Sequence, residues 1–377
     1  MNLSHWESQS FFQDIEFAII GSGIVGLNAA IALKQCHPHA KIVIFERGII
    51  PSGASTRNAG FACFGSMTEL IDDIESMGED AVWELVQKRW LGLLSLRQSL
   101  GDQQIGYEHK GGFELFRPSE RSIYEACLEK MPQFNQRLKE ITGESAVFVA
   151  RGERLASLGF GGIQHLIQNQ AEGQIHTGNM MKALLEKAKS LDIQIFNGLG
   201  IKEISESASS VHLLTRDGWE LQAKRLIVAT NGFARQLLPD LSVRPARNQV
   251  WLTREIHHLP WQGCYHYDKG YVYFRNIGKR VLIGGARNLD PAGETTAKFG
   301  RSPSIERALK QLLDEVVLPH QPWELERKWS GILGVGEEKR PIVVRHGKRT
   351  VVAVRLGGMG VAIGSWVGQE AARLLRQ

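Results

Sequence analysis

The sequence predicts an α/β protein of two domains, each discontinuous along the chain. Strand-like and helix-like segments alternate near both ends and between residues 179 and 232, which is typical of a largely parallel sheet covered by helices. Between residues 243 and 283 the pattern changes to short alternating strands rich in aromatic residues, which indicates a mostly antiparallel sheet. A chain of 377 residues is long enough for two such units.

A glycine-rich turn near the N-terminus is the most specific motif. The segment Gly21-Ser22-Gly23-Ile24-Val25-Gly26 separates an apolar strand from a helical run, and Glu46 ends the next strand. The glycines allow a tight turn, close approach of a pyrophosphate and close packing of helix on strand, while free N–H groups at the helix start face the phosphates. Glu46 is placed to accept hydrogen bonds from a ribose diol. The segment therefore predicts a Rossmann-like, dinucleotide-binding βαβ unit.

Apolar spacing and turn residues predict the remaining elements. Residues 51–60 form a loop, residues 68–100 form two amphipathic helices, and residues 105–117 form a hairpin with Gly111-Gly112 at its centre. The next elements are helices over 119–141 and 179–190 and strands over 193–196, 198–204 and 225–232, with a hairpin turn at 215–219. They are followed by strands over 249–253, 271–275 and 280–283, a helix over 304–317, a strand over 350–354 and a closing helix to residue 375.

Composition and charge argue against several other classes of function. The net charge of +5 comes from scattered basic residues without a block of like charges, which favours a solvated surface over nucleic-acid binding. The four cysteines have no C-x-x-C or zinc-finger spacing and the histidines form no ligand pattern, so we expect neither disulfides nor a metal site. No segment has the pattern of a signal peptide or a membrane span, so we expect a cytoplasmic protein.

Six motifs, in this order, carry a family resemblance. They are the glycine turn with Glu46, the loop Gly53-Ala54-Ser55-Thr56-Arg57-Asn58-Ala59-Gly60, the segment Asn179-Met180-Met181-Lys182-Ala183-Leu184 before residues 201–204, then Val228-Ala229-Thr230-Asn231-Gly232, Trp329-Ser330-Gly331 and Gly357-Gly358-Met359-Gly360. On these residues the chain resembles FAD-dependent oxidoreductases of the D-amino-acid oxidase, glycine oxidase and sarcosine oxidase type. The resemblance implies a FAD-binding domain of residues 1–65, 160–240 and 329–377 and a substrate domain of residues 66–159 and 241–328.

The resemblance also implies which residues meet the FAD. Glu46 and Arg47 would contact the adenosine end, and Ile201 would contact the adenine through its backbone. The other expected contacts are Ser55, Thr56, Arg57, Asn58, Ala59 and Gly60 beside the pyrophosphate and flavin, Ala229, Thr230, Asn231 and Gly232 closing over the cofactor, and Gly357, Gly358, Met359, Gly360 and Val361 at the flavin ring. Arg355 could add positive charge there, although an arginine at a strand end is more often solvated or ion-paired. Independently of the family, a helix that begins after Gly360 would point free N–H groups at the negative charge of a reduced flavin. The cysteine that tethers flavin in some sarcosine oxidases has no evident equivalent, so we expect noncovalent FAD.

Candidate catalytic and substrate-contacting residues lie on the aromatic strand and in the loop. Tyr271, Tyr273 and Arg275 share one strand face because alternate residues point the same way. Two phenols and a guanidinium could line a cavity for an anionic or amino-acid-like substrate, although a half-exposed sheet face is an equal alternative. Arg57 is the fourth candidate, because related sarcosine oxidases have Thr-Arg at this point of the loop. Candidates of second rank are Trp251 and Arg287.

One departure from the family bears on the substrate. Many amino-acid-oxidising relatives have an arginine after Trp-x-Gly that holds the substrate carboxylate, whereas this chain continues with Ile332-Leu333. Either another arginine takes that role, or the substrate is an amine without an α-carboxylate.

The predicted function is oxidation of the C–N bond of an amine or amino acid. A hydride passes to flavin N5, the imine is hydrolysed, and the electrons pass to oxygen or another acceptor. Two alternatives stay open: a nicotinamide-dependent Rossmann dehydrogenase, which shares the first motif, and a FAD-containing binding or assembly module without turnover of its own.

Overall fold

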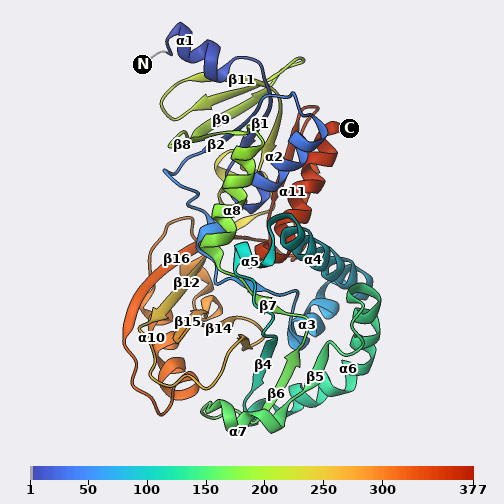
Figure 1. The fold of residues 1–377 in the computed structure, drawn as a ribbon, viewed down its shortest axis with the longest axis vertical. Helices are drawn as coiled ribbons and strands as arrows, with labels where there is room; N and C mark the ends of the chain where they lie inside the picture. The colour runs from blue at the N-terminus through green and yellow to red at the C-terminus, as the bar shows by residue number, and fades with distance from the viewer. Residues whose placement is uncertain (1–2) are drawn as a thin grey trace.

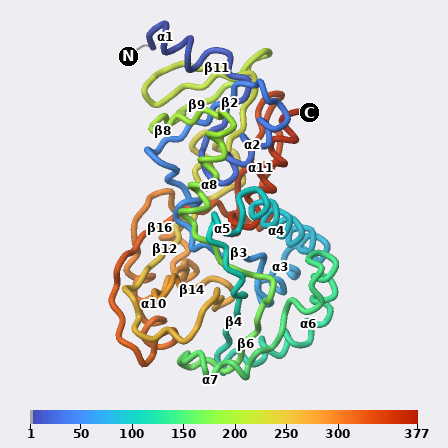
Figure 2. Tube along the Cα trace, viewed as in Figure 1, coloured from blue at the N-terminus to red at the C-terminus, as the bar shows by residue number. Residues whose placement is uncertain are grey.

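The computed structural model describes residues 3–377 and contains two eight-stranded sheets, one in each half of an elongated molecule (Figure 1). The first and last parts of the chain, blue and red, lie together in the half that holds β1 (Ile15–Ile20), β2 (Ile42–Glu46) and α11 (Gly360–Arg376). The trace in Figure 2 shows that the other half is built from teal, green and orange segments. Each half therefore combines segments that are far apart in the sequence.

The first sheet has a parallel centre. Its strands lie in the order β17 (Ile342–Arg345), β18 (Thr350–Val354), β11 (Glu220–Val228), β1, β2 and β8 (Gln194–Asn197), and β9 (Ile201–Glu206) and β10 (Val211–Thr215) branch from β11. The five strands from β18 to β8 run parallel, and β17 is an antiparallel edge. Strands β2 and β18 are buried along their whole length, as expected of parallel strands that are covered on both faces.

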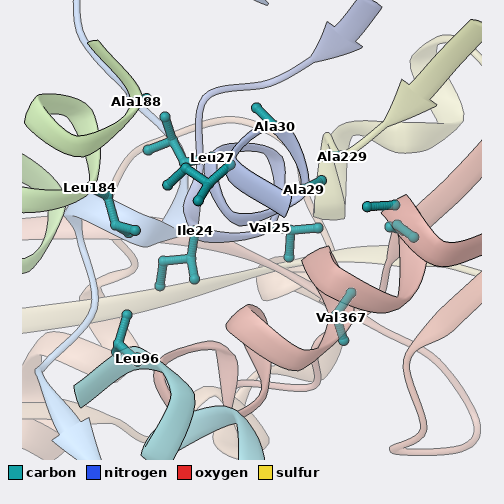
Figure 3. Close-up of a cluster of buried hydrophobic side chains, with 14 of the residues drawn as sticks. Ile24, Val25, Leu27, Ala29, Ala30, Leu96, Leu184, Ala188, Ala229 and Val367 are labelled. Carbon is teal, nitrogen blue, oxygen red and sulfur yellow. The ribbon is translucent and has the colours of Figure 1, made fainter. Parts of the chain in front are cut away.

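Helices α2 (Ile24–Cys36), α8 (Thr177–Ser190) and α11 pack into one core with strands of this sheet. Figure 3 shows this core, to which α2 contributes Leu27, α8 contributes Leu184, α11 contributes Val367 and α4 (Glu79–Leu100) contributes Leu96. Helix α4 approaches α11 closely because residue 92 is glycine, where a Cβ would collide with the carbonyl of Ala362. Within residues 3–377, no helix combines the length and apolar character that a membrane crossing requires.

The second sheet is mostly antiparallel. Its strands lie in the order β16 (Leu325–Val335), β12 (Arg244–Thr253), β15 (Arg280–Gly285), β14 (Val272–Ile277), β13 (Cys264–Tyr267), β4 (Gly112–Phe116), β6 (His165–Asn169) and β5 (Phe148–Ala150). Helices α3 (Met67–Met77), α4 and α6 (Arg121–Thr142) form a core with residues of β4, β5 and β6, and α10 (Pro303–Leu312) joins an aromatic core around Tyr265 and Phe274. The short elements are α1 (His5–Glu7), α5 (Asp102–Ile105), α7 (Leu155–Leu158), α9 (Pro291–Glu294), β3 (Phe61–Ala62) and β7 (Gly173–Gln174).

The predicted α/β class is confirmed, but the predicted hairpin at residues 105–117 is wrong. Residues 102–105 form α5, and β4 pairs with β6 and β13 instead of folding back on the preceding segment. The two glycines serve close packing: a Cβ on Gly112 would collide with the Glu172 carboxylate, and Gly111 has φ +81°. A glycine pair indicates an unusual backbone position, which is not always a hairpin turn.

The pairing of two strands disagrees with two of the expected domain boundaries. The boundaries at residues 160 and 329 place β6 and most of β16 in the first domain. Strand β6 pairs with β4 and β5, however, and β16 pairs with β12 over ten residues. Both strands therefore belong to the second sheet. The other limits of the division stay a prediction.

Candidate functional site

Two adjoining cavities extend from the carboxyl ends of the parallel strands to the second sheet. The first is lined by residues at the ends of β1, β2, β11 and β18 and has an empty volume of about 1440 Å³, its open mouth included. The second lies against β12 and β14 and has a similar volume of about 1510 Å³. The walls shared by both cavities are Ala54, Asn58, Leu333, Gly358 and Val361. A long ligand could therefore fill the first cavity and present one end to the second.

The glycine turn forms one wall of the first cavity. Gly21 has φ +105°, and a Cβ there would lie 2.8 Å from the carbonyl oxygen of Ala229. A Cβ on Gly26 would collide with the carbonyl of Gly21, so the third glycine lets α2 pack directly on the turn. At the start of α2, the N–H of Ile24 donates to Ser55 Oγ at 3.0 Å. The turn thus leaves backbone N–H groups and open space at a helix N-terminus, which suits a pyrophosphate.

Glu46 and Arg47 form the adjacent end of this cavity. The Glu46 carboxylate is buried and accepts hydrogen bonds from the N–H and the hydroxyl of Ser22, at 3.1 and 2.8 Å, and from the N–H of Gly48 at 2.9 Å. These bonds fix its position beside the glycine turn. The guanidinium of Arg47 lies 3.6 Å from the ring centre of Phe233, and burial lowers the pKa of Arg47. Both side chains line the cavity, as the adenosine end of FAD would require.

The loop at residues 54–60 forms the wall between the cavities. The hydroxyl of Thr56 donates to the carbonyl of Pro51 at 2.8 Å, and Asn58 accepts from the hydroxyl of Thr177 at 2.9 Å. Arg57 lines the second cavity, but its guanidinium donates to the carbonyls of Ser52 and Ser330, at 3.2 and 3.0 Å. Arg57 therefore holds the loop against β16, and much of its donor capacity is used.

The junction of the cavities lies at the start of α11. Gly360 and Val361 open this helix, and the N–H groups of a first helical turn have no partner within the helix. The dipole of α11 therefore places partial positive charge at the junction. Nearby, the buried hydroxyl of Thr230 lines the first cavity and has no hydrogen-bond partner within residues 3–377. Such an unpaired donor fits a ligand that supplies its acceptor.

Arg355 is placed differently from what the sequence suggests. Its backbone N–H donates to the Asn231 side chain at 3.1 Å, and its guanidinium donates to the carbonyls of Arg340 and Ser242, at 2.8 and 3.1 Å. The side chain lines neither cavity. Its bonds join β18 to two neighbouring loops.

The aromatic strand contributes two of its three candidate side chains to the second cavity. Tyr271 and Tyr273 line the cavity, and the hydroxyl of Tyr273 accepts from Asn248 Nδ2 at 3.3 Å. Burial raises the pKa of Tyr273, against a smaller opposing effect of Arg287, so its phenol keeps its proton. Arg275 is buried outside the cavity wall and donates to the carbonyl of Ile175 at 3.0 Å.

Of the two candidates of second rank, Arg287 and Trp251, the structure places only Arg287 in a cavity wall. Arg287 lines the second cavity, beside Tyr271. Trp251 is buried on β12 and lines neither cavity.

Two ion pairs lie in the wall of the second cavity. Asp72 and Asp73 of α3 pair with Lys269 and Lys339, at 2.9 and 2.6 Å, and all four residues line the cavity. These pairs tie α3 to the loop before β14 and the loop after β16. Sequence reasoning missed them because the partners are far apart in the chain and no motif links them.

A buried polar cluster borders the same cavity, because its members Cys63 and His266 belong to the cavity wall. His266 Nε2 lies 3.2 Å from a carboxylate oxygen of Glu172, whose other oxygen accepts from the N–H groups of Phe64 and Gly65. The thiol of Cys63 belongs to the same cluster, within 4.8 Å of both groups. Burial lowers the pKa of His266, but the hydrogen bond to Glu172 and nearby carboxylates outweigh it and raise the pKa to about 9. The cluster is thus a hydrogen-bonded ion pair, and the expectation that the protein holds no metal stays a prediction.

Most predicted cofactor residues lie in a cavity wall. The exceptions, which line neither cavity, are Ser22, Gly26, Thr56, Gly232 and Arg355. Wall residues of the first cavity that sequence reasoning missed include Leu199, Lys202, Arg216, Phe233, Gln236 and Leu237. They come from β9 and the segment before it, from the turn between β10 and β11, and from the turn after β11. The sequences of these segments carry no motif that would have identified them.

Comparison with known proteins identifies the family. Residues 16–374 match the FAD dependent oxidoreductase family, so the chain belongs to this family of FAD-dependent flavoproteins. It is 25% identical over 363 residues to a glycine oxidase of Geobacillus kaustophilus, covering 91% of this chain and 87% of the relative.

Solved structures show the same fold. A crystal structure of glycine oxidase from Geobacillus kaustophilus has a TM-score of 0.76 at 21% identity and covers 96% of this chain and 94% of that one. Iminodiacetate oxidase from Chelativorans sp. BNC1 has a TM-score of 0.74 at 19% identity, with 96% and 95% covered.

Proposed function

We propose that this flavoprotein oxidises the C–N bond of an amine or amino acid bound in the second cavity. The observation that carries the proposal is that the two cavities adjoin: a cavity with the features of a dinucleotide site shares the wall residues Asn58, Gly358 and Val361 with a second cavity that is lined by polar side chains. This arrangement brings one end of a long cofactor into contact with a small molecule.

The first cavity offers a group for each part of FAD. Glu46 and Arg47 would hold the adenosine end, and the start of α2 with Ser55 would bind the pyrophosphate. The flavin ring would lie at the junction, where the start of α11 stabilises negative charge. Each of these groups acts through hydrogen bonds or charge, so the site requires no covalent tether.

The second cavity would position the substrate. When bound, FAD supplies the hydride acceptor, and the imine that forms is released to water. Tyr273 and Tyr271 would fix the substrate's orientation from β14 and the residue before it. Arg57 holds the loop beside which the flavin would lie. Because oxidation of a neutral amine depends on positioning the C–H bond, the chain needs no dedicated base.

The alternatives are weaker than this reading. A nicotinamide-dependent enzyme is set aside because the family uses FAD. A FAD-containing binding module without turnover is distinguished by the reduction test below, because a module of this kind would bind the ligand without bleaching the flavin.

The test is anaerobic reduction of the bound FAD. The purified holoprotein is mixed with a panel of primary amines, secondary amines and α-amino acids, and the visible flavin absorbance is followed. We expect at least one compound to bleach the absorbance, and readmission of air with peroxide detection then shows whether oxygen is the acceptor. A holoprotein that no member of the panel reduces, while dithionite reduces it fully, would contradict the proposal.

A further inference from the structure

The charge of the second cavity bears on the kind of amine it takes. Its wall contains three arginines and two lysines, Arg57, Arg89, Arg287, Lys269 and Lys339, and also His266, whose charge is paired with Glu172. It contains three carboxylates: Glu69, Asp72 and Asp73. The two lysines are neutralised by the two aspartates in direct ion pairs. The remaining wall carries more positive than negative charge, which favours an anionic ligand.

Two of the three arginines in this wall already have partners. Arg57 donates to the carbonyls of Ser52 and Ser330. Arg89 is buried, donates to the carbonyl of Phe64 at 2.8 Å and lies in the field of Glu69 and Asp73. Neither guanidinium is free to bind a ligand as a bidentate donor.

Arg287 differs from both. Its guanidinium forms no hydrogen bond or ion pair with any of residues 3–377, and it lies over the ring of Tyr271, 5.3 Å from the ring centre. The side chain is half-buried. Because no group within the described residues occupies its N–H donors, this guanidinium keeps them for a ligand in the cavity that it lines.

The backbone holds Arg287 in this position. The preceding residue, Ala286, has φ +60°, a conformation that costs a non-glycine residue free energy, and its N–H donates to the carbonyl of Tyr271 at 2.8 Å. A Cβ on Gly285 would collide with that same carbonyl. The end of β15 is therefore fixed against Tyr271, and Arg287 follows as the first residue of a 3-10 turn.

The neighbouring side chains suit an anion. Tyr273 accepts a hydrogen bond from Asn248, so the hydrogen of its own hydroxyl remains to be donated. A carboxylate in this part of the cavity would receive charge-assisted hydrogen bonds from Arg287 and a further bond from Tyr273.

From this geometry we infer that Arg287 binds the anionic group of the substrate, a carboxylate, in place of the arginine that is absent at Ile332-Leu333. The inference rests on the proposed function, since the carboxylate belongs to the amine that is oxidised. It makes the substrate an amino acid, and Arg287 the residue that selects it over the corresponding amine.

Binding of acetate to the FAD-loaded protein tests this inference without turnover. The dissociation constants of acetate and of its neutral analogue acetamide are measured by calorimetry or from the shift in the flavin spectrum. We expect Arg287→Met to weaken acetate binding at least about tenfold, with Arg287→Lys intermediate and acetamide unchanged, because a charge-assisted pair is lost. Arg254→Met is the control, since Arg254 pairs with Glu324 at an exposed site outside both cavities.

Steady-state kinetics extend the test to the reaction. For an amino acid that reduces the flavin, Arg287→Met should lower kcat/KM about a hundredfold, mainly through KM, and should leave the matching amine without a carboxylate within about twofold. Equal losses for acetate and acetamide, or no loss of acetate binding, would overturn the inference. If acetate binding depends on Arg287 but no amine or amino acid reduces the flavin, the anion site stands and the proposed reaction fails.

Discussion

At position 26, the helix after the glycine turn touches the turn itself. A methyl group there would collide with the carbonyl of Gly21, so we expect Gly26→Ala to displace α2 and cost roughly 1–3 kcal/mol of stability, as overpacking does in a tight core. The same displacement should reduce the bound FAD per protein. Thermal unfolding and flavin content measure both effects.

The matched control for Gly26→Ala is Gly152→Ala. A Cβ on Gly152 would meet nothing within 4 Å, so this variant should unfold and bind FAD like the parent. If both alanine variants behaved alike, close packing at Gly26 would not be what the motif provides.

The ion pair of His266 and Glu172 gives the protein a distinct pH dependence. The pKa of His266 is raised to about 9 in the folded state, because Glu172 and the carboxylates of Glu69 and Glu114 outweigh burial. A group with a raised pKa stabilises the fold fully below its unfolded pKa of about 6.5, and this contribution is lost as the pH rises through about 9. From the size of this shift, the full contribution is about 3 kcal/mol.

Chemical unfolding of the parent and of His266→Gln, from pH 6 to pH 10, measures this contribution. We expect the difference in unfolding free energy between the two proteins to shrink by up to about 3 kcal/mol as the pH rises. A difference that stays constant over that range would show that His266 is not a charged partner of Glu172.

Among the elements, the segment that carries Arg287 is anchored by a buried ion pair. Glu294, at the end of α9, accepts two hydrogen bonds from Arg247 of β12, at 3.0 and 2.8 Å, and both side chains are largely buried. Glu294→Gln leaves the Arg247 charge unpaired, so we expect a loss of about 3–5 kcal/mol. The variant should also weaken acetate binding, since residues 287–294 would be less firmly held.

An exposed pair provides the comparison for Glu294→Gln. Asp314 and Lys310 pair on the surface of the second half, so Asp314→Asn should cost less than about 1 kcal/mol and leave acetate binding unchanged. Similar losses in the two variants would contradict the buried anchor. Urea unfolding measures both.

The elements also show what the sequence could and could not predict. The strands and helices around the glycine turn were predictable because their apolar runs and glycines act locally. The hairpin at residues 105–117 was predicted wrongly because Gly111 and Gly112 serve contacts with Glu172, sixty residues away. The pairing of β6 and β16 depends on partners distant in the chain, which periodicity does not identify.

For the whole molecule, the cofactor cavity was more predictable than the substrate cavity. The cofactor cavity combines a few contiguous motifs at the ends of parallel strands, where α/β folds bind nucleotides. The substrate cavity is lined from α3, α4, α11, β3, β12, β13, β14, β16 and the loops between elements. The ion pairs of Lys269 and Lys339, the place of His266 and the free guanidinium of Arg287 therefore appear only when the chain is folded. Sequence spacing likewise could not tell that Arg275, on the same strand face as Tyr273, lies outside the wall of the cavity that Tyr273 lines.

A crystal structure of the FAD-loaded protein tests the central claim most directly, namely that one cofactor spans both cavities. The account predicts adenosine at Glu46 and Arg47, the pyrophosphate at the start of α2, and the flavin ring at the junction between Asn58 and Gly358, with one face open to Tyr273 and Arg287. A ring that lies outside this junction, or whose faces are both closed off from the second cavity, would contradict it.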